Sequence, residues 1–337
     1  MIPVMKVHVI SETQLVMKGT GIHTAFLEHI GLLREKGDVE VVVNNEGTGD
    51  VFHSHTYFFY YFWKGRKYKG RRVFTAHVIP DSAKGSLPVW QLFMPFIRWG
   101  LKRVYEYADV CVAPSPMVER AIEATGAKTR IVRIYNPINI EFWKRTDEMR
   151  SRGRQLLGVG ENEFVVLGVG QLQARKGVDD FLEIAEAIPE ARFVWAGGRP
   201  FGLLTEGIVR ISEKARKASA HVILAGQVAL DQMPLFYAAS DLMISTSHQE
   251  TFGLAPLEAA SSGMPVIFRD IEEYKVLFDN PYLKASSVSQ YIDMTRRMMN
   301  DREYYSESLA ISAKLPLQFD KNKIREEFIS LYKSLLH

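Results

Sequence analysis

The sequence has a single cysteine among its 337 residues, Cys111. One cysteine cannot form an internal disulfide or a cysteine-based zinc cluster, and its rarity is typical of a reducing cytoplasm. No run of about 18 uninterrupted apolar residues is present, so the sequence predicts no membrane-spanning helix. The opening residues, MIPVMKVHVI, lack the charged, apolar and small-residue zones of a signal peptide, and we expect a cytoplasmic protein.

Strong net charge is also absent, because the chain carries only +3. The charge is nevertheless uneven: residues 1–150 hold 21 Lys and Arg against 15 Asp and Glu, a balance of +6, which leaves −3 for the remainder. A basic half beside an acidic half indicates that one half meets an anionic partner. Nucleic acid, a membrane surface and a phosphorylated ligand all fit this pattern.

Short runs rich in Val and Ile alternate with helical stretches, and the series occurs twice. Such alternation predicts parallel sheets with helices on both faces. The first set of predicted strands covers residues 6–10, 39–43, 51–55, 72–77, 110–113 and 131–134. The second set covers residues 164–169, 192–196, 222–224, 242–245 and 265–268. The main predicted helices cover residues 22–36, 178–187, 233–239, 255–262 and 321–336.

The chain therefore predicts an α/β protein with two doubly wound, Rossmann-like domains. We expect an N-terminal domain of residues 1–145, completed by a C-terminal helix of residues 320–337, and a second domain of residues 155–318. The polar segment of residues 139–160 reads as the linker between them. Two such sheets can face each other across a cleft, and ligands bind in open α/β sheets at the carboxyl ends of the strands.

The segment HQETFGLAPLE follows a predicted strand and leads into a helix. Gly253, between Phe252 and Leu254, allows a ligand to approach the backbone closely, and free N–H groups at a helix start favour a phosphate. Glu250 before the turn and Glu258 within the helix are suitable acceptors for sugar and ribose hydroxyls. This context favours a nucleotide-sugar site over two ordinary surface glutamates.

A second glycine-flanked loop, GVGQLQARKG, also lies between a predicted strand and a helix. Its strand ends at Gly170, and Arg175 and Lys176 are adjacent cations suited to neutralising a diphosphate as it leaves. The sequence contains no Asp-x-Asp motif or other acidic metal cluster, so we expect no metal ion.

The segments GQLQARKG and QETFGLAPLEAASSGMPVI together resemble the donor site of retaining family-4 glycosyltransferases with the GT-B fold. The resemblance implies that Glu250 and the amides after it hold the donor sugar, and that Glu258 holds the nucleotide ribose. It implies that Arg175 and Lys176 hold the diphosphate. It also implies two domains facing a cleft, with a last helix that crosses back to the first domain.

The first domain can be compared with the same family. Gly19 and Gly21 lie where the family has a glycine-rich loop near the donor phosphates. His77 ends the strand RVFTAH and matches a family histidine near the donor sugar. The strand DVFHSH, with His53 and His55, resembles the family's DVVHAH strand. By this resemblance the catalytic residues are His77, Glu250, Arg175 and Lys176, and no cofactor is needed beyond the donor.

Aromatic residues and cations gather in residues 57–72 and 87–105 of the first domain. Six cations lie between Lys64 and Arg72 without an acidic residue, and the second stretch mixes Trp and Phe with Arg and Lys. This mixture suits the headgroup–acyl boundary of an anionic bilayer. A core helix beside a solvated basic loop is the plainer reading. Nucleic acid is disfavoured, because the donor motifs explain the binding site without it.

The phrases HVIPDSAKGSL and VWAGGRPFG resemble bacterial transferases that add a second hexose to monoglycosyl-diacylglycerol. The resemblance implies retaining, metal-independent transfer from UDP-glucose or UDP-galactose to a glycolipid such as monoglucosyl-diacylglycerol, at the inner face of the cell membrane. One alternative is a soluble family-4 transferase acting on a polysaccharide, a lipopolysaccharide or a small sugar. Others are a glycoside hydrolase using Glu250 and Glu258, and a non-catalytic nucleotide-sugar binder.

Overall fold

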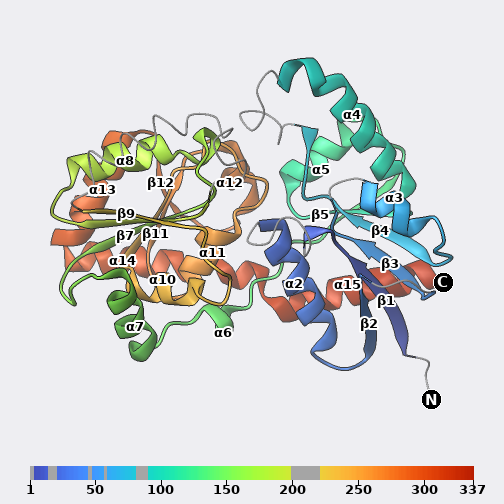
Figure 1. Cartoon of the computed structure of the whole chain (residues 1–337), viewed down its shortest axis with the longest axis horizontal. Helices are drawn as coiled ribbons and strands as arrows, with labels where there is room; N and C mark the ends of the chain where they lie inside the picture. The colour runs from blue at the N-terminus through green and yellow to red at the C-terminus, as the bar shows by residue number, and fades with distance from the viewer. Residues whose placement is uncertain (1–3, 14–20, 45–47, 57–58, 81–89, 199–220) are drawn as a thin grey trace. The chain divides into compact units, whose positions relative to one another are not determined.

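The computed structural model describes residues 4–13, 21–44, 48–56, 59–80, 90–198 and 221–337. These residues fold as two compact units, shown in Figure 1. The first unit is built from the described residues up to 138 together with residues 319–337, and the second from residues 139–318.

The first unit is a six-stranded parallel sheet with the strand order β2-β1-β3-β4-β5-β6. Its strands are β1 (Met5–Ile10), β2 (Val39–Val43), β3 (Val51–Ser54), β4 (Arg71–Thr75), β5 (Val110–Ala113) and β6 (Arg130–Arg133). Its helices are α2 (Gly21–Arg34), α3 (Phe59–Gly65), α4 (Trp90–Tyr107), α5 (Pro116–Glu123) and α15 (Lys321–Leu336).

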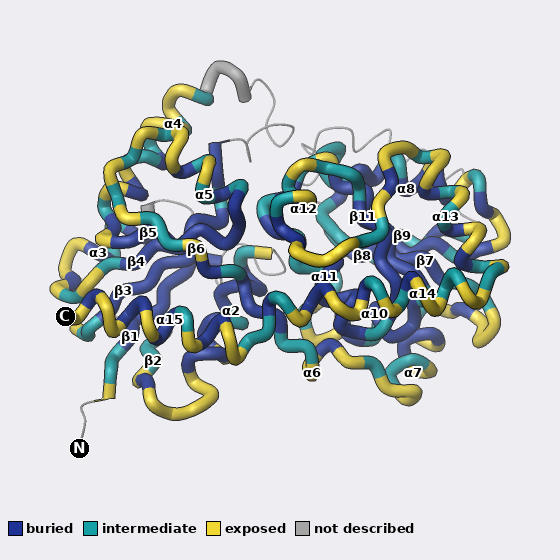
Figure 2. The backbone as a smooth tube through the Cα atoms, turned by 180° about the vertical axis from the view of Figure 1, so that it is seen from behind, coloured by how far each residue is buried: buried dark blue, intermediate teal, exposed yellow. Residues whose placement is uncertain are grey.

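Alternating side chains explain why this sheet is covered on both faces. Val51 and Val73 point to the core that contains α2 and α15, whereas the next residues, Phe52 and Phe74, point to the core under α3, α4 and α5. Successive strand residues face opposite sides, so two apolar faces need two layers of helices. Figure 2 shows the strands as the buried centre of the unit.

The last helix, α15, belongs to the first unit, as the sequence predicts. Its residues Ile324, Phe328 and Tyr332 lie in the same core cluster as Phe26 of α2. The fully buried Arg325 donates from Nε to the carbonyl oxygen of Leu32 over 3.0 Å. The chain thus returns from the second unit to complete the core of the first.

The second unit is also a six-stranded parallel sheet, with the order β12-β11-β10-β7-β8-β9. Its strands are β7 (Val165–Val169), β8 (Arg192–Ala196), β9 (Val222–Gly226), β10 (Leu242–Ser245), β11 (Val266–Arg269) and β12 (Leu283–Ala285). Its α-helices are α6 (Ile140–Trp143), α7 (Asp147–Leu157), α8 (Val178–Ala187), α10 (Met233–Ala239), α11 (Leu254–Ser261), α12 (Glu272–Leu277), α13 (Val288–Asn300) and α14 (Arg302–Ser312). Two short 3-10 helices are η2 (Ala174–Lys176) and η4 (Pro316–Phe319).

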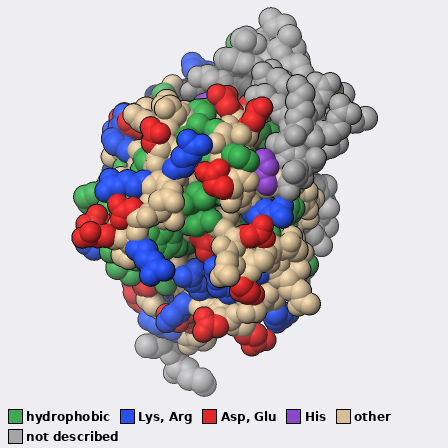
Figure 3. Space-filling view, turned by 90° about the vertical axis from the view of Figure 1, so that its left-hand side faces the viewer, with side chains coloured by type: hydrophobic (Ala, Val, Ile, Leu, Met, Phe, Trp, Pro, Cys, Tyr) green, Lys and Arg blue, Asp and Glu red, His purple; other side chains and the backbone are tan. Residues whose placement is uncertain are grey.

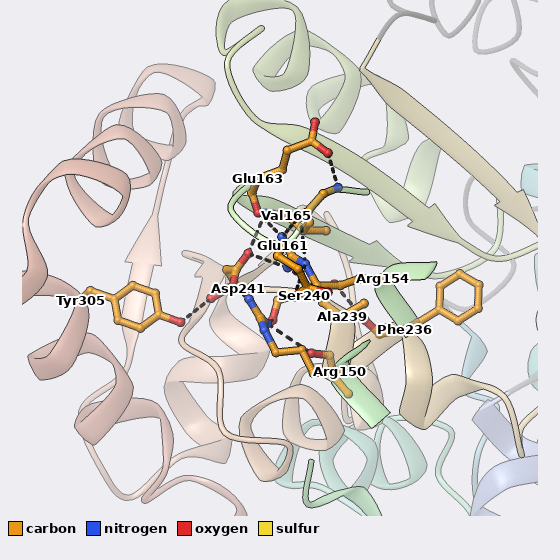
Figure 4. Close-up of polar contacts among 12 residues, drawn as sticks. Arg150, Arg154, Glu161, Glu163, Val165, Phe236, Ala239, Ser240, Asp241 and Tyr305 are labelled. Atoms are coloured by element: carbon orange, nitrogen blue, oxygen red, sulfur yellow. Dashed lines mark hydrogen bonds and ion pairs between the residues drawn. The ribbon is translucent and has the colours of Figure 1, made fainter. Parts of the chain in front are cut away.

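The segment expected as a linker, residues 139–160, is helical and forms α6 and α7. Figure 4 shows how two of its charged residues pair within the second unit: Arg154, fully buried, and Arg150 both contact Asp241. Arg154 also donates to the carbonyl oxygens of Gly160 and Ala239, and Asp241 accepts from the backbone N–H of Val165. These ion pairs and hydrogen bonds hold α7 against the sheet of the second unit.

Candidate active site

A mostly buried ion pair at the carboxyl ends of the second sheet joins Lys176 and Glu250. Lys176 ends η2 after strand β7, and Glu250 lies in the loop that follows the neighbouring strand β10. Lys176 Nζ lies 2.5 Å from Glu250 Oε1, and both side chains are mostly buried. The two segments that carry the donor motifs in the sequence therefore meet at this pair.

Backbone contacts hold the two loops against each other. The hydroxyl of Thr246 donates to the carbonyl oxygen of Lys176 over 3.1 Å, and the N–H of His248 donates to that of Arg175 over 2.9 Å. Gly177 has φ of +69°, and a Cβ there would lie 2.0 Å from the carbonyl oxygen of Thr246. Only glycine fits this close crossing, which fixes the position of Lys176.

The environment keeps the Lys176–Glu250 pair ionised. Burial alone would raise the pKa of Glu250, but Lys176 and Arg175 beside it hold that pKa below its ordinary value. Burial lowers the pKa of Lys176, with Glu250 opposing the shift. The site thus holds a carboxylate and an ammonium group out of water, ready to contact polar groups of a ligand.

Arg175 contributes a second cation beside this pair. Its Nη1 donates to the carbonyl oxygen of Gln249 over 2.9 Å. Its Nε is buried and has no hydrogen-bond partner within the part of the chain that the structure describes. A buried donor without an acceptor is costly, so this N–H is well suited to an anionic ligand.

Helix α11 presents its N-terminus at the same edge of the sheet. Gly253 caps the helix with φ of +85°, and a Cβ there would lie 2.9 Å from the hydroxyl of Tyr274. Within α11, Glu258 Oε2 accepts a 2.6 Å hydrogen bond from the hydroxyl of Tyr237 on α10. Glu250 and Glu258 therefore have different partners, a cation for one and a phenol for the other.

In the first unit, His77 lies just beyond β4 and belongs to a buried group of imidazole rings. His77 Nε2 lies 2.9 Å from Nδ1 of His55, which follows β3. His55 stacks on His53 with ring centroids 4.6 Å apart, and His29 of α2 lies 4.8 Å from His55. Tyr332 of α15 contacts His53 and His29 through its hydroxyl, at 2.5 Å and 2.9 Å.

Three of these rings are close enough to suggest a metal site, because ligand atoms of His29, His53 and His55 lie within 4.8 Å of one another. However, His53 uses both ring nitrogens, Nδ1 with Tyr332 and Nε2 with Thr75. Among the described residues, His29 Nδ1 and His55 Nε2 are the ring nitrogens of these three histidines that have no hydrogen-bond partner. Two open nitrogens are fewer than the three or four ligands of zinc sites, so the cluster fits a hydrogen-bonded network better than a metal centre.

Comparison with known proteins identifies the family. Family models described as "Glycosyl transferases group 1" and "Glycosyltransferase Family 4" match residues 150–310 and 44–142. The alpha-galactosylglucosyldiacylglycerol synthase of Streptococcus pneumoniae is 32% identical over 289 residues, which are 82% of this chain and 76% of that protein. The chain belongs to glycosyltransferase family 4. The glycosyltransferase is also 28% identical to the processive diacylglycerol alpha-glucosyltransferase of Acholeplasma laidlawii, over 80% of each chain.

Solved structures confirm the GT-B fold. HepE of Anabaena, crystallised with UDP and glucose, matches with a TM-score of 0.77 at 18% identity, over 98% of this chain and 100% of that one. Sucrose-phosphate synthase of Thermosynechococcus elongatus matches with a TM-score of 0.78 at 16% identity, over 98% and 99%. The two parallel sheets of the glycosyltransferase thus correspond to the two sheets of this fold.

The predicted site residues fall in three groups. Gly170, Arg175, Lys176, Glu250, Phe252, Gly253, Leu254 and Glu258 all lie at or near the carboxyl edge of the second sheet. Gly21 begins α2 and His77 follows β4, both in the first unit. Gly19 lies outside the described residues, as do residues 81–87 and 199–202 of the two glycolipid-synthase phrases. Sequence reasoning missed Tyr237, Tyr274 and Tyr332, because no motif links these tyrosines to their partners.

Replacing Tyr332 with phenylalanine is expected to destabilise the glycosyltransferase by about 1–3 kcal/mol, since His53 and His29 each lose a buried hydrogen-bond partner. Urea unfolding of the variant measures the loss. Tyr304→Phe is the matched control, because Tyr304 is only half-buried on α14. Equal stability of the two variants would contradict the network.

The structure describes part of the aromatic and basic surface predicted for the first unit. Trp63 at the end of α3 and Phe96 and Trp99 on α4 are 62%, 73% and 64% exposed. Lys64 lies over the ring of Trp63, and Arg103 over that of Trp99. The side chains of Trp90 and Phe93 lie outside the described residues. Within the described part of the chain, no helix has both the length and the apolar character needed to cross a bilayer.

Proposed function

We propose that the protein transfers a hexose from UDP-glucose or UDP-galactose to a glycolipid acceptor, monoglucosyl-diacylglycerol, making a diglycosyl-diacylglycerol. The observation that carries this is the 32% identity, over 76% of its length, to a synthase named for galactosylglucosyldiacylglycerol. A second relative is named for diacylglycerol glucosylation. Both names describe the transfer of sugar to a diacylglycerol lipid.

The chemistry of the second unit supports a nucleotide-sugar donor. A diphosphate needs cations, and Arg175 offers a buried Nε–H that no described residue accepts. Sugar hydroxyls need acceptors, and Glu250 is held as a carboxylate. When the donor binds, Lys176 exchanges its ion pair with Glu250 for one with the diphosphate. The carboxylate of Glu250 then accepts hydrogen bonds from the sugar hydroxyls. Glu258 accepts from the ribose, held in place by Tyr237.

The reaction we propose is retaining. The bond between the sugar's anomeric carbon and the diphosphate oxygen breaks, and the acceptor oxygen forms its bond on the same face. The acceptor's proton passes to the departing diphosphate, whose growing charge is stabilised by Arg175 and Lys176. The lowered pKa of Glu250 argues against its serving as the acid of a glycosidase, because that acid needs a raised pKa to be protonated at neutral pH.

The reaction is also proposed to be independent of metal ions. Two cationic side chains and the N-terminus of α11 supply the positive charge that a divalent cation would otherwise bring. The test is transfer activity after chelation with EDTA, compared with the same protein resupplied with magnesium. A loss that magnesium restores would overturn metal independence and leave the donor and acceptor proposals standing.

The function is tested by an activity panel that crosses donors with acceptors. UDP-glucose, UDP-galactose and GDP-mannose are each combined with monoglucosyl-diacylglycerol, diacylglycerol, an oligosaccharide and no acceptor, and UDP release and product formation are measured. NMR of the product gives the linkage and the anomeric configuration. Transfer to the glycolipid with an α linkage is the expected result. Transfer only to the oligosaccharide would favour a soluble polysaccharide transferase instead.

Replacing Glu258 with alanine is expected to weaken UDP binding by about 1.5–3 kcal/mol, the value of a charge-assisted hydrogen bond to the ribose. Isothermal titration with UDP measures it. Tyr237→Phe is the matched control, because it removes the hydroxyl behind Glu258 but keeps the carboxylate. If Glu258→Ala binds UDP as tightly as the wild type, the ribose assignment is wrong.

We further propose that the first unit attaches reversibly to the inner face of the cell membrane. Four of the six cations of residues 64–72, namely Arg66, Lys67, Lys69 and Arg71, are exposed, close in sequence to exposed Trp63. Such a surface attracts anionic lipids at roughly 1 kcal/mol per basic residue and inserts aromatic rings at the interface. The second unit offers a contrast, because its face in Figure 3 mixes acidic and basic side chains.

Replacing Lys64, Arg66, Lys67 and Lys69 with serine is expected to lower binding to phosphatidylglycerol vesicles about tenfold or more at low salt. Slow donor hydrolysis should persist, because the donor motifs lie in the second unit. The matched control replaces four exposed cations of the second unit, Lys144, Arg152, Arg302 and Lys314. Cosedimentation at low and high salt compares the two. Wild-type protein that ignores the vesicles at low salt would refute attachment.

A further inference from the structure

Four histidines share one buried site in the first unit, and His55 connects His77 to the other two. His29, His53 and His55 are fully buried, and His77 is nearly so. Burial lowers the pKa of His77 to about 4 and that of His29 to about 3. Burial also lowers the pKa values of His53 and His55. Each ring is therefore neutral at pH 7 and has one N–H donor and one acceptor nitrogen.

Three hydrogen bonds made by two residues, Tyr332 and Thr75, fix the rings behind His55. His53 lies between the hydroxyls of Tyr332 and Thr75, at 2.5 Å and 2.7 Å. Tyr332 has one hydroxyl proton, so it donates to one of His53 and His29 and accepts from the other. This arrangement locks both rings, and it uses a residue of α15, the last helix, to do so.

His55 has no freedom to rotate, because rings surround it. It stacks between His53 at 4.6 Å and His77 at 5.1 Å, both with interplanar angles of 27°, and Phe26 and His29 lie at 6.1 Å and 4.8 Å. What remains variable is the position of its proton. Nδ1 of His55 contacts Nε2 of His77 at 2.9 Å, whereas Nε2 of His55 has no hydrogen-bond partner among the described residues.

The two possible tautomers differ in what they leave unpaired. A proton on Nε2 of His55 would be a buried N–H without an acceptor, a situation that costs on the order of 1–3 kcal/mol. A proton on Nδ1 leaves an unpaired acceptor instead, and among buried backbone groups an unpaired acceptor is less rare than an unpaired N–H. The second arrangement makes His55 the donor and Nε2 of His77 the acceptor, so that His77 carries its own proton on Nδ1.

We propose that His55 is a positioning residue: its Nδ1–H donates to Nε2 of His77, which orients the His77 ring and fixes it as the Nδ1–H tautomer. His77 then offers an N–H donor, and not a lone pair, to an oxygen of the ligand. This role resembles that of the residues that orient metal-binding histidines. There, the hydrogen bond made by one ring nitrogen fixes the tautomer, and thereby whether the other nitrogen can bind the metal. Its effect on turnover rests on the proposed function, but the tautomer itself does not.

The experiment reads the tautomer directly by NMR of protein labelled with nitrogen-15 at histidine, without donor or acceptor. His77 is assigned by its disappearance in His77→Ala. The wild type should show a protonated Nδ1 and an unprotonated Nε2 at pH 7. His55→Asn keeps an N–H near the position of Nδ1 and should preserve this pattern. His55→Leu has no donor and should let His77 exchange between both tautomers.

The turnover number kcat of the His55 variants is the second measurement that tests the proposal. His55→Leu is expected to lower kcat on the order of 10–100-fold with little change in UDP affinity, as for other orienting partners, and His55→Asn should recover most of it. Tyr332→Phe is the structural control: it should lower stability without moving the His77 tautomer. If transfer to the glycolipid is absent in the wild type, slow hydrolysis of the donor replaces it as the assay.

Several results would overturn the proposal. A wild-type His77 protonated on Nε2 would reverse the direction of the hydrogen bond. Equal losses of kcat in His55→Leu and His55→Asn, in step with their losses of stability, would reduce His55 to a packing residue. A wild type that transfers no hexose to glycolipid refutes the proposed function alone, because the tautomer is measured in the free protein.

Discussion

Replacing Lys176 with alanine is expected to lower kcat for hexosyl transfer by about 10²–10³-fold, as does the loss of one donor that stabilises a developing anion. Lys176 Nζ lies 2.5 Å from Glu250 in the free protein and passes to the diphosphate in our proposal. The diphosphate gains charge as the sugar leaves, so the cation matters most in the transition state. Steady-state kinetics with saturating donor and acceptor measure the change.

Two variants sharpen this test. Lys176→Arg keeps the charge in a different shape and should retain part of the activity. Lys314→Ala removes an exposed lysine of the second unit and should leave kcat unchanged. A rise in acceptor KM in Lys176→Ala, with kcat unaltered, would show that the side chain serves acceptor binding instead.

Lys176 also predicts the alkaline limb of the pH profile. Burial holds the pKa of Lys176 below the ordinary 10.5, despite the opposing charge of Glu250. Its ammonium group is therefore lost at a lower pH than that of an exposed lysine. We expect kcat/KM for the donor, which reports the free enzyme, to fall with this lowered pKa. In Lys176→Arg the fall should move to higher pH.

The sequence was most informative where local pattern and burial agree. Residues 110–113, 192–196 and 242–245 were predicted as strands and form β5, β8 and β10 with those bounds. Buried parallel strands have apolar side chains on both faces, so they read as continuous Val and Ile runs. Strand β12 was missed, because three residues at the sheet edge, Leu283–Ala285, are too few to show a pattern.

The predicted seam at residues 139–160 starts where the second unit starts, at residue 139, but α6 and α7 occupy most of it. Residues 139–160 are rich in charge, which is typical of exposed segments. The structure buries Arg154 against the carbonyl oxygens of Gly160 and Ala239 and the carboxylate of Asp241. These partners are brought near only by folding. Composition reports how polar a segment is, but not whether distant groups pair with its charges.

The candidate site shows the same limit. Motifs select Arg175, Lys176 and Glu250, because these residues lie in short loops directly after predicted strands and so can be recognised from the sequence alone. They do not select Tyr237, a residue of another helix that donates a hydrogen bond to Glu258. Nor do they select Tyr332 of the last helix, which is hydrogen-bonded to His53 and His29. Residues that position a functional group act through tertiary contacts, and such contacts leave no local pattern. The His55–His77 contact likewise depends on the pairing of β3 with β4.

Replacing Glu250 with glutamine is expected to lower kcat by about 10²–10³-fold, since a neutral amide stabilises the developing positive charge of the sugar less than a carboxylate does. UDP itself lacks the sugar and should bind with nearly wild-type affinity. Glu258→Ala is the contrasting variant, expected to lose UDP binding. Titration with UDP and transfer kinetics on both proteins separate the two carboxylates. If both variants bind UDP as the wild type does, the assignment of the pair fails.

The same variant tests the ion pair by its response to acid. Because Lys176 and Arg175 hold the folded-state pKa of Glu250 below the ordinary 4.5, the carboxylate stabilises the folded protein above that pH. This contribution must fade as the pH falls through the lowered pKa, where Glu250 takes up a proton in the folded state. Urea unfolding of the wild type should therefore show a steeper loss of stability as the pH falls below 4.5 than unfolding of Glu250→Gln, whose side chain cannot titrate. Parallel curves would mean that Glu250 does not form the ionised pair with Lys176 in solution.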